Sequence, residues 1–273
     1  MKKFFIVALS LICIICAGCV QINFDLIITD SGEVVRKWKC IGTVPFLQQI
    51  ETAKIKNEKL FPDLKVKTIV EGDMRGYEFT LNYPDIESFA RASSEFYSVN
   101  PEKNKGISRH KGWFFDEYDF DFYIKCPPAN SYLISATVDQ AMFSKVIYEN
   151  VITLPYPAVN HDADEVSADG KVLKWNLAPI LVYGGERHMN ARFKLWHKDK
   201  IALTAIAELL LFAATIFFFI KARADDLEGV GKDLRFKRNI FAILFVALGA
   251  ISAYLIFTPV VFTEADIISI AAP

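Results

Sequence analysis

Residues 117–124, Glu-Tyr-Asp-Phe-Asp-Phe-Tyr-Ile, alternate between acidic and aromatic side chains at their start. Successive side chains of a β-strand point to opposite faces, so Tyr118, Phe120 and Phe122 share one face. Asp119 and Asp121 then share the other face. The alternation predicts a strand with a core face and a solvated face. The alternative interpretation is that the three aromatic side chains line an apolar pocket and face a ligand.

Further strands and two helices are predicted on both sides of this stretch. Pro45 suits the first turn of one helix, and Asp85 can cap a second helix that runs to about Phe96. Two helices over strands that mostly follow one another as hairpins predict an α+β domain with a mainly antiparallel sheet. The predicted strands cover residues 22–28, 33–41, 64–70, 77–81, 107–114, 118–124, 146–154, 172–177 and 190–196.

Two long apolar runs follow this domain. Residues 201–220 contain one charged side chain, Glu208, and residues 240–262 contain none. Each run is long enough to cross a bilayer as a helix, which predicts a two-helix transmembrane hairpin. The connector, residues 221–238, carries six Lys or Arg against four acids. The positive-inside rule therefore places the connector in the cytoplasm and the domain outside the cytoplasmic membrane.

Glu208 is the one ionisable residue within the two spans, and such residues are functional candidates. Tyr254 on the second run is expected at a similar depth in an antiparallel hairpin. A hydrogen bond from a protonated Glu208 to Tyr254 would hold the hairpin together. The alternative is a role for Glu208 in transport, signalling or contact with a membrane-protein partner.

The N-terminus has the layout of a secretory signal. Lys2 and Lys3 precede an apolar run of 12 residues, 4–15, which is too short to span a membrane. Cys16-Ala17-Gly18-Cys19 resembles the lipobox of bacterial lipoproteins and predicts lipid attachment at Cys19, which anchors the chain stably when several acyl chains are present. The predicted division is signal peptide 1–18, extracytoplasmic domain 19–198, first span 199–221, cytoplasmic loop 222–238, second span 239–262 and extracytoplasmic tail 263–273.

No sequence motif points to an enzyme, a cofactor or a metal. The four histidines show no metal-binding spacing, and no nucleophile elbow is present. The formal net charge of −1 argues against a nucleic-acid partner. Cys40 and Cys126 leave two alternatives open, one disulfide or two free thiols. Trp175 is expected in the core, and residues 160–170 are expected to form a polar loop.

Several motifs together resemble the LppM-type lipoprotein family. They are the Asp-Ser-Gly-Glu turn at 30–33 behind the lipobox, Ile-Thr-Leu-Pro at 152–155, and Gly-Lys-Val-Leu-Lys-Trp-Asn-Leu at 170–177. The resemblance implies an envelope lipoprotein with an α/β domain, a link to membrane lipids and no catalytic residues. The second predicted span departs from the single span expected for this family.

The sequence therefore predicts a non-enzymatic cell-envelope lipoprotein that binds membrane lipid or another apolar ligand. The alternative is an accessory or scaffold subunit that docks on a membrane-protein partner through its transmembrane hairpin. A cavity in the domain would favour lipid binding. A solid core with an exposed apolar patch would favour docking.

Overall fold

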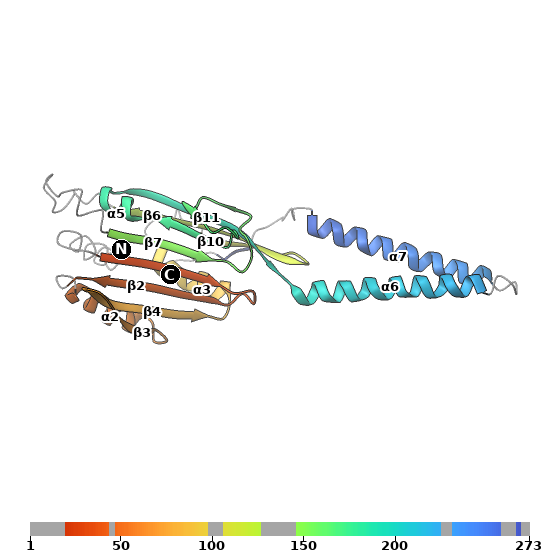
Figure 1. Cartoon of the computed structure of the whole chain (residues 1–273), viewed down its shortest axis with the longest axis horizontal. Coiled ribbons are helices and arrows are strands. Elements are labelled where there is room, and N and C mark those ends of the chain that lie inside the picture. The colour runs from red at the N-terminus through yellow and green to blue at the C-terminus, as the bar shows by residue number, and fades with distance from the viewer. Residues whose placement is uncertain are drawn as a thin grey trace. The chain divides into compact units, whose positions relative to one another are not determined.

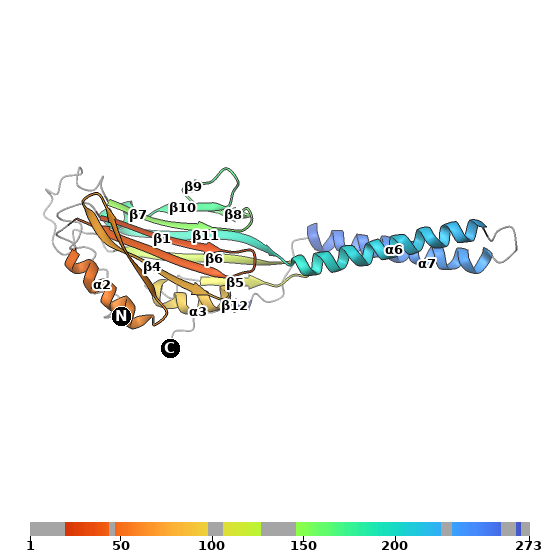
Figure 2. The same cartoon turned by 60° about the horizontal axis from the view of Figure 1, so that its bottom comes forward.

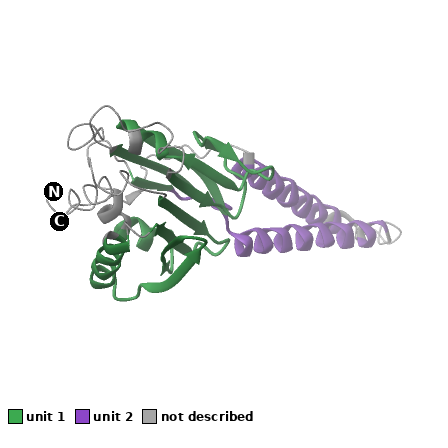
Figure 3. Ribbon diagram, turned by 60° about the vertical axis from the view of Figure 1, so that its left-hand side comes forward, with its two compact units in different colours: residues 1–109, 118–195, 266–273 green, residues 110–117, 196–265 purple. Residues whose placement is uncertain are grey.

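The computed structural model describes residues 20–43, 47–97, 106–126, 146–224, 231–257 and 266–268. The chain divides into two compact units (Figure 3). Unit 1 comprises residues 1–109, 118–195 and 266–273, and unit 2 comprises residues 110–117 and 196–265. The predicted signal peptide and Cys19 lie outside the described residues, so lipid attachment stays a prediction.

A seven-stranded sheet forms the larger part of unit 1 (Figure 1). Its order is β3-β4-β2-β1-β7-β10-β9. All its strand pairs are antiparallel except β1 with β7, which is parallel. The strands are β1 (Val20–Ile28), β2 (Val34–Gly42), β3 (Lys65–Glu71), β4 (Met74–Tyr83), β7 (Val146–Thr153), β9 (Glu165–Val166) and β10 (Val172–Asn176).

The second sheet has five strands in the order β12-β5-β6-β11-β8. Its edge strand β12 follows the apolar hairpin in sequence and pairs antiparallel with β5. The α+β class is confirmed, but the structure has two sheets where the sequence predicts one. Alternation of side chains shows that a segment is a strand, but it does not identify the strand with which that segment pairs. The strands are β5 (Gly106–His110), β6 (Phe115–Cys126), β8 (Asn160–His161), β11 (Gly185–Trp196) and β12 (Asp266–Ile268).

Among its described residues, unit 1 has three helices: α2 (Leu47–Leu60), α3 (Ile86–Tyr97) and the short α5 (Ala178–Tyr183). Figure 2 shows α2 and α3 on the same side of the strands. The predicted cap of α3 is confirmed, because the Ser88 N–H donates to Asp85 Oδ1 at 2.6 Å. This bond satisfies one of the backbone donors that every helix leaves free at its start.

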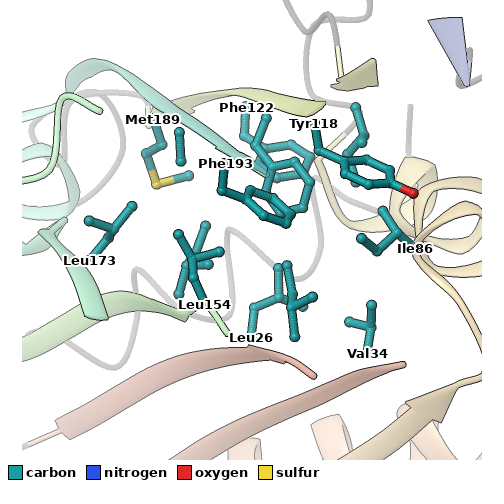
Figure 4. Close-up of a cluster of buried hydrophobic side chains, with 14 of the residues drawn as sticks. Leu26, Val34, Ile86, Tyr118, Phe122, Leu154, Leu173, Met189 and Phe193 are labelled. Atoms are coloured by element: carbon teal, nitrogen blue, oxygen red, sulfur yellow. The ribbon is translucent and has the colours of Figure 1, made fainter. Parts of the chain in front are cut away.

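The main core lies between the two sheets and α3. Figure 4 shows Tyr118, Phe122 and Phe193 of the second sheet facing Leu26 and Val34 of the first. The Tyr118 and Phe193 rings stack with centroids 5.5 Å apart, and Phe193 is fully buried. Trp175 is also fully buried, as its place in an alternating strand predicts.

Unit 2 contains α6 (Lys198–Ala224) and α7 (Gly231–Phe257). Both helices are long and apolar enough to cross a membrane, judged by length and composition. Large apolar side chains such as Leu209 and Ile243 are 66% and 67% exposed. An α-helix of 27 residues is about 40 Å long, which exceeds the roughly 30 Å of a hydrocarbon core. The helices are therefore suited to a membrane environment.

Aromatic contacts set the register of α6 against α7. Phe212 lies 5.5 Å from Phe245, and Phe218 lies 5.3 Å from Phe241, measured between ring centroids. Four residues before Phe212 is Glu208, and four residues after Phe245 is Gly249. In an antiparallel pair these two positions lie at the same level.

The expected pairing of Glu208 with Tyr254 is not formed. No hydrogen bond joins them within the described part of the hairpin, and Tyr254 is 65% exposed. The physical reason is the register, which puts Tyr254 five residues beyond the level of Glu208. Depth estimated from residue counts alone misses a shift of this size.

We expect Asp85→Ala to lower the free energy of unfolding of the domain by about 1 kcal/mol, because it removes the cap of α3. Hydrogen bonds from Ser88 hold the pKa of Asp85 below its usual range. The stabilisation is therefore complete above the unfolded pKa of about 3.9 and is lost as the pH falls through the lower folded pKa. Urea unfolding of the full chain in micelles, followed by near-UV circular dichroism, measures both effects.

Asp85→Ser is the control, because serine keeps a capping oxygen without a titrating group. It should retain most of the stability and lose this part of the acid dependence. Equal stability of Asp85→Ala and the parent chain at neutral pH would contradict the capping role.

Candidate functional site

The aromatic face predicted at Tyr118, Phe120 and Phe122 lies in the main core. These side chains are 3%, 1% and 1% exposed. Phe120 contacts both Phe122 and Phe193, with ring centroids 5.7 and 5.2 Å apart. Neighbouring protein side chains therefore occupy this face, which leaves it no surface for a ligand.

A second group of aromatic side chains lies at the other end of the same face of the seven-stranded sheet. Phe24 pairs with Trp38 across β1 and β2, and Trp38 pairs with Phe79 across β2 and β4. We call the group the α2 aromatic cluster, because α2 packs on this end of the sheet through Ile50. Its members are Phe24, Trp38, Phe61, Tyr77, Phe79 and Tyr148.

The rings of this cluster contact one another. Trp38 stacks on Phe79 with centroids 5.1 Å apart, and Phe61 meets Trp38 edge-on at 6.5 Å. Phe24 meets Tyr148 edge-on at 5.9 Å. Such contacts contribute about 0.5–1.5 kcal/mol each beyond simple burial.

Helix α2 covers the cluster only in part. Ile50 is the one fully buried side chain among the described residues of α2, whereas Ile55 is 47% exposed. Beneath the helix, Trp38 and Phe79 are buried, but Phe24 and Tyr148 are only half-buried. Apolar surface thus remains accessible at this end, in contrast to the closed core at the other.

Charged groups border the cluster on two sides. The guanidinium of Arg36, a residue only 3% exposed, lies 5.4 Å from the Trp38 ring centroid. Lys54 Nζ lies 4.9 Å over the Tyr77 ring, and the Tyr77 hydroxyl donates to Glu51 Oε2 at 2.5 Å. This hydrogen bond raises the pKa of Tyr77 and lowers the pKa of Glu51.

The α2 aromatic cluster thus combines accessible apolar rings with nearby cations, a combination suited to an amphiphile with an anionic group. The sequence-based predictions did not include it. Tyr77, Phe79, Leu81 and Tyr83 alternate just as 118–122 do, so a signal was present in β4. The cluster itself forms only when β1, β2 and β4 are placed side by side.

The segment 160–170, predicted as a polar loop, contains the two-residue strands β8 and β9, and its side chains stabilise the fold. Asp162 Oδ1 accepts hydrogen bonds from Trp175 Nε1 and from the Asn190 N–H, both at 2.8 Å. Arg187 Nη2 donates to Asp164 Oδ1 at 2.7 Å. Within the described residues, no group of three or more His, Cys, Asp or Glu side chains is arranged to hold a metal ion.

Cys40 is a free thiol close to the α2 aromatic cluster. Burial raises its pKa to about 12. Cys40 thus forms no disulfide in the structure, whereas the side chain of Cys126 lies outside the described residues.

Glu208 is half-buried at the level of Gly249 in unit 2. A Cβ added to Gly249 would meet no atom within 4 Å beyond its own turn of helix. The hairpin therefore has open space on α7 at the level of its one intramembrane acid.

Comparisons with known proteins give little further guidance. No protein-family model matches the chain, and no curated protein matches it. Among solved structures, it is similar to the NMR structure of the folded domain of LppM from Mycobacterium tuberculosis, with a TM-score of 0.38 and 12% identity. The match covers 67% of this chain and 93% of that one. At these values the likeness does not establish a common family.

We expect Cys40 to resist alkylation by a maleimide at pH 8 in the folded chain, because burial keeps it as the unreactive thiol. Peptide mapping by mass spectrometry measures the labelled fraction at each cysteine. Labelling of Cys40 should become complete in urea without a reductant. If Cys40 is labelled in urea only after reduction, it forms a disulfide and the free thiol is wrong.

Proposed function

We propose that this chain is a non-enzymatic cell-envelope lipoprotein of the LppM type, with its folded domain outside the cytoplasmic membrane. The domain binds a lipid or another amphiphile at the α2 aromatic cluster. The main core is closed, so the cavity expected for lipid binding does not lie there. The proposal is carried instead by the incomplete cover of the α2 aromatic cluster, where Phe24 and Tyr148 stay half-buried beneath α2.

Membrane attachment rests on the apolar hairpin and on the chain's return to the domain after it. The chain leaves β11 for α6 and, after α7, contributes β12 to the sheet that contains β11. If both helices insert, a hairpin whose two ends lead back to one sheet crosses the bilayer twice and leaves both ends on the same side. The basic connector between the helices favours the cytoplasm, which supports a domain on the opposite side.

The chemistry of the α2 aromatic cluster supports an anionic amphiphile as the ligand. An acyl chain would contact the exposed edges of Phe24, Phe61 and Tyr148, where burial of apolar area is favourable at about 25 cal/mol per Å². The cation that borders these rings at the surface is Lys54, whose Nζ also lies 3.4 Å from Glu51 Oε1, and the buried Arg36 lies beside Trp38. An anionic group would compete with Glu51 for Lys54. The non-enzymatic part of the proposal rests on the lack of a catalytic motif in the sequence.

Photocrosslinking in nanodiscs tests this function in the full chain. The probe is phosphatidylglycerol with a diazirine on its acyl chain, and crosslinked peptides are identified by mass spectrometry. We expect crosslinks in peptides that contain Phe24, Phe61 or Tyr148, in addition to those in α6 and α7 from the surrounding bilayer. Crosslinks confined to α6 and α7 would contradict lipid binding by the domain.

Phe61→Ala and Leu60→Ala form a matched pair for this experiment. Phe61 contacts Trp38, whereas the neighbouring Leu60 is 52% exposed. Losing about 40 Å² of apolar contact between the Phe61 ring and the acyl chain, which is about 1 kcal/mol, should lower the crosslink yield in the domain roughly fivefold in Phe61→Ala. Leu60→Ala should leave the yield unchanged, and an equal fall in both variants would argue against the α2 aromatic cluster.

The open space at Gly249 favours a second candidate, an accessory subunit that docks on a membrane-protein partner. A partner helix with a hydrogen-bond donor could approach Glu208 there, because small residues let helix backbones come close. Gly249→Leu should break the resulting complex, and Ala247→Leu on an exposed face of α7 should not. Blue-native electrophoresis of solubilised membranes measures the complex, and equal masses for both variants would exclude docking at this point.

A further inference from the structure

The connection between β5 and β6 belongs to the same compact unit as the apolar helices. Residues 110–117 group with α6 and α7, although they lie about 80 residues before α6 in sequence. Figure 3 colours them with the helices. Specific interactions within unit 2 explain this grouping.

His197, the residue immediately before α6, is the centre of these interactions. Its N–H donates to the carbonyl oxygen of Phe114 at 2.8 Å, and its Nδ1 lies 3.1 Å from the carbonyl oxygen of Trp113. Its Nε2 lies 3.4 Å from Asp116 Oδ2. The rings of Phe115 and Trp196 meet edge-on with centroids 5.0 Å apart.

Asp116 is a buried side chain that stabilises the turn between β5 and β6. Asp116 is 3% exposed, and its Oδ1 accepts a hydrogen bond from the Gly112 N–H at 3.2 Å. The carboxylate therefore links the turn before β6 to the residue that precedes α6. Buried carboxylates are stable where hydrogen bonds of this kind satisfy them.

The backbone carbonyl of Trp113 contacts His197, but the Trp113 side chain is exposed. It is 52% exposed, and Lys200 Nζ lies 5.4 Å from its ring centroid. The residue after Lys200, Ile201, opens the apolar part of α6. The contacts with His197 and Lys200 therefore place Trp113 beside the first turn of α6, where the apolar part of the helix begins.

We propose that Trp113 and Lys200 form an interfacial anchor for the phospholipid headgroup layer on the domain side of the membrane. The indole occupies the boundary between headgroups and acyl chains, where tryptophan is favoured. The Lys200 ammonium pairs with lipid phosphate while its aliphatic stem stays on apolar surface. His197 and Asp116 position the turn so that Trp113 stays level with the start of α6.

This anchor is independent of the ligand proposed for the α2 aromatic cluster. It requires that α6 enters a bilayer, and it sets the depth at which α6 does so. It also holds whichever side of the membrane the domain occupies, because Trp113 and the start of α6 share one unit.

Fluorescence quenching in the full chain tests the anchor. The chain is placed in nanodiscs of phosphatidylethanolamine and phosphatidylglycerol that carry a spin label either near the headgroup or deep in the acyl chain. Subtracting the emission of Trp113→Phe from that of the parent isolates Trp113 from Trp38, Trp175 and Trp196. We expect the shallow label to quench this difference signal roughly twice as strongly as the deep label.

Two outcomes would overturn the proposal. Quenching of Trp113 by aqueous iodide and by neither lipid label would place it in water. Quenching by none of the three would place it against protein instead. Near-UV circular dichroism from the buried Trp38 and Trp175 checks that Trp113→Phe remains folded.

His197→Ala tests the positioning role. The variant keeps Trp113 and Lys200 but removes the imidazole that contacts Trp113 and Asp116. We expect quenching by the shallow label to fall while iodide quenching rises. An unchanged quenching profile would show that His197 does not position the anchor.

Discussion

The structure depends on one constraint, the need to cover a single apolar face of a seven-stranded sheet. Along β1, the side chains of Val20, Ile22, Phe24, Leu26 and Ile28 all point to that face because a strand alternates with a period of two. The opposite face of β1 and β2 carries half-buried polar groups such as Asp25 and Lys37 beside the buried Ile41. Among the described residues, strands of the second sheet, α2 and α3 all pack on the apolar face.

Two sets of elements cover this apolar face, one more completely than the other. At one end, the second sheet and α3 close the main core over Leu26 and Val34. At the other end, α2 offers one fully buried side chain, Ile50, among its described residues. The contrast locates the candidate ligand surface at the α2 aromatic cluster, and it separates that surface from the aromatic face of β6, which is buried in the closed core.

Local patterns in the sequence predicted most of the elements but not their arrangement. The alternation at 118–122 and the cap at Asp85 each depend on neighbouring residues, and both are present in the structure. The second sheet, the parallel pairing of β1 with β7 and the α2 aromatic cluster depend on contacts between distant segments. The register of α6 against α7 also depends on contacts between distant segments. For this reason, residue counting in the sequence predicted a pairing of Glu208 with Tyr254.

Hydrogen exchange in the full chain, measured in nanodiscs with and without added palmitate, tests the central claim that α2 is an incomplete cover over a ligand surface. We expect the amides of α2 to exchange faster than those of α3 in the absence of palmitate and to become protected when it is added. Equal protection of α2 and α3 without palmitate, with no change on its addition, would contradict this claim.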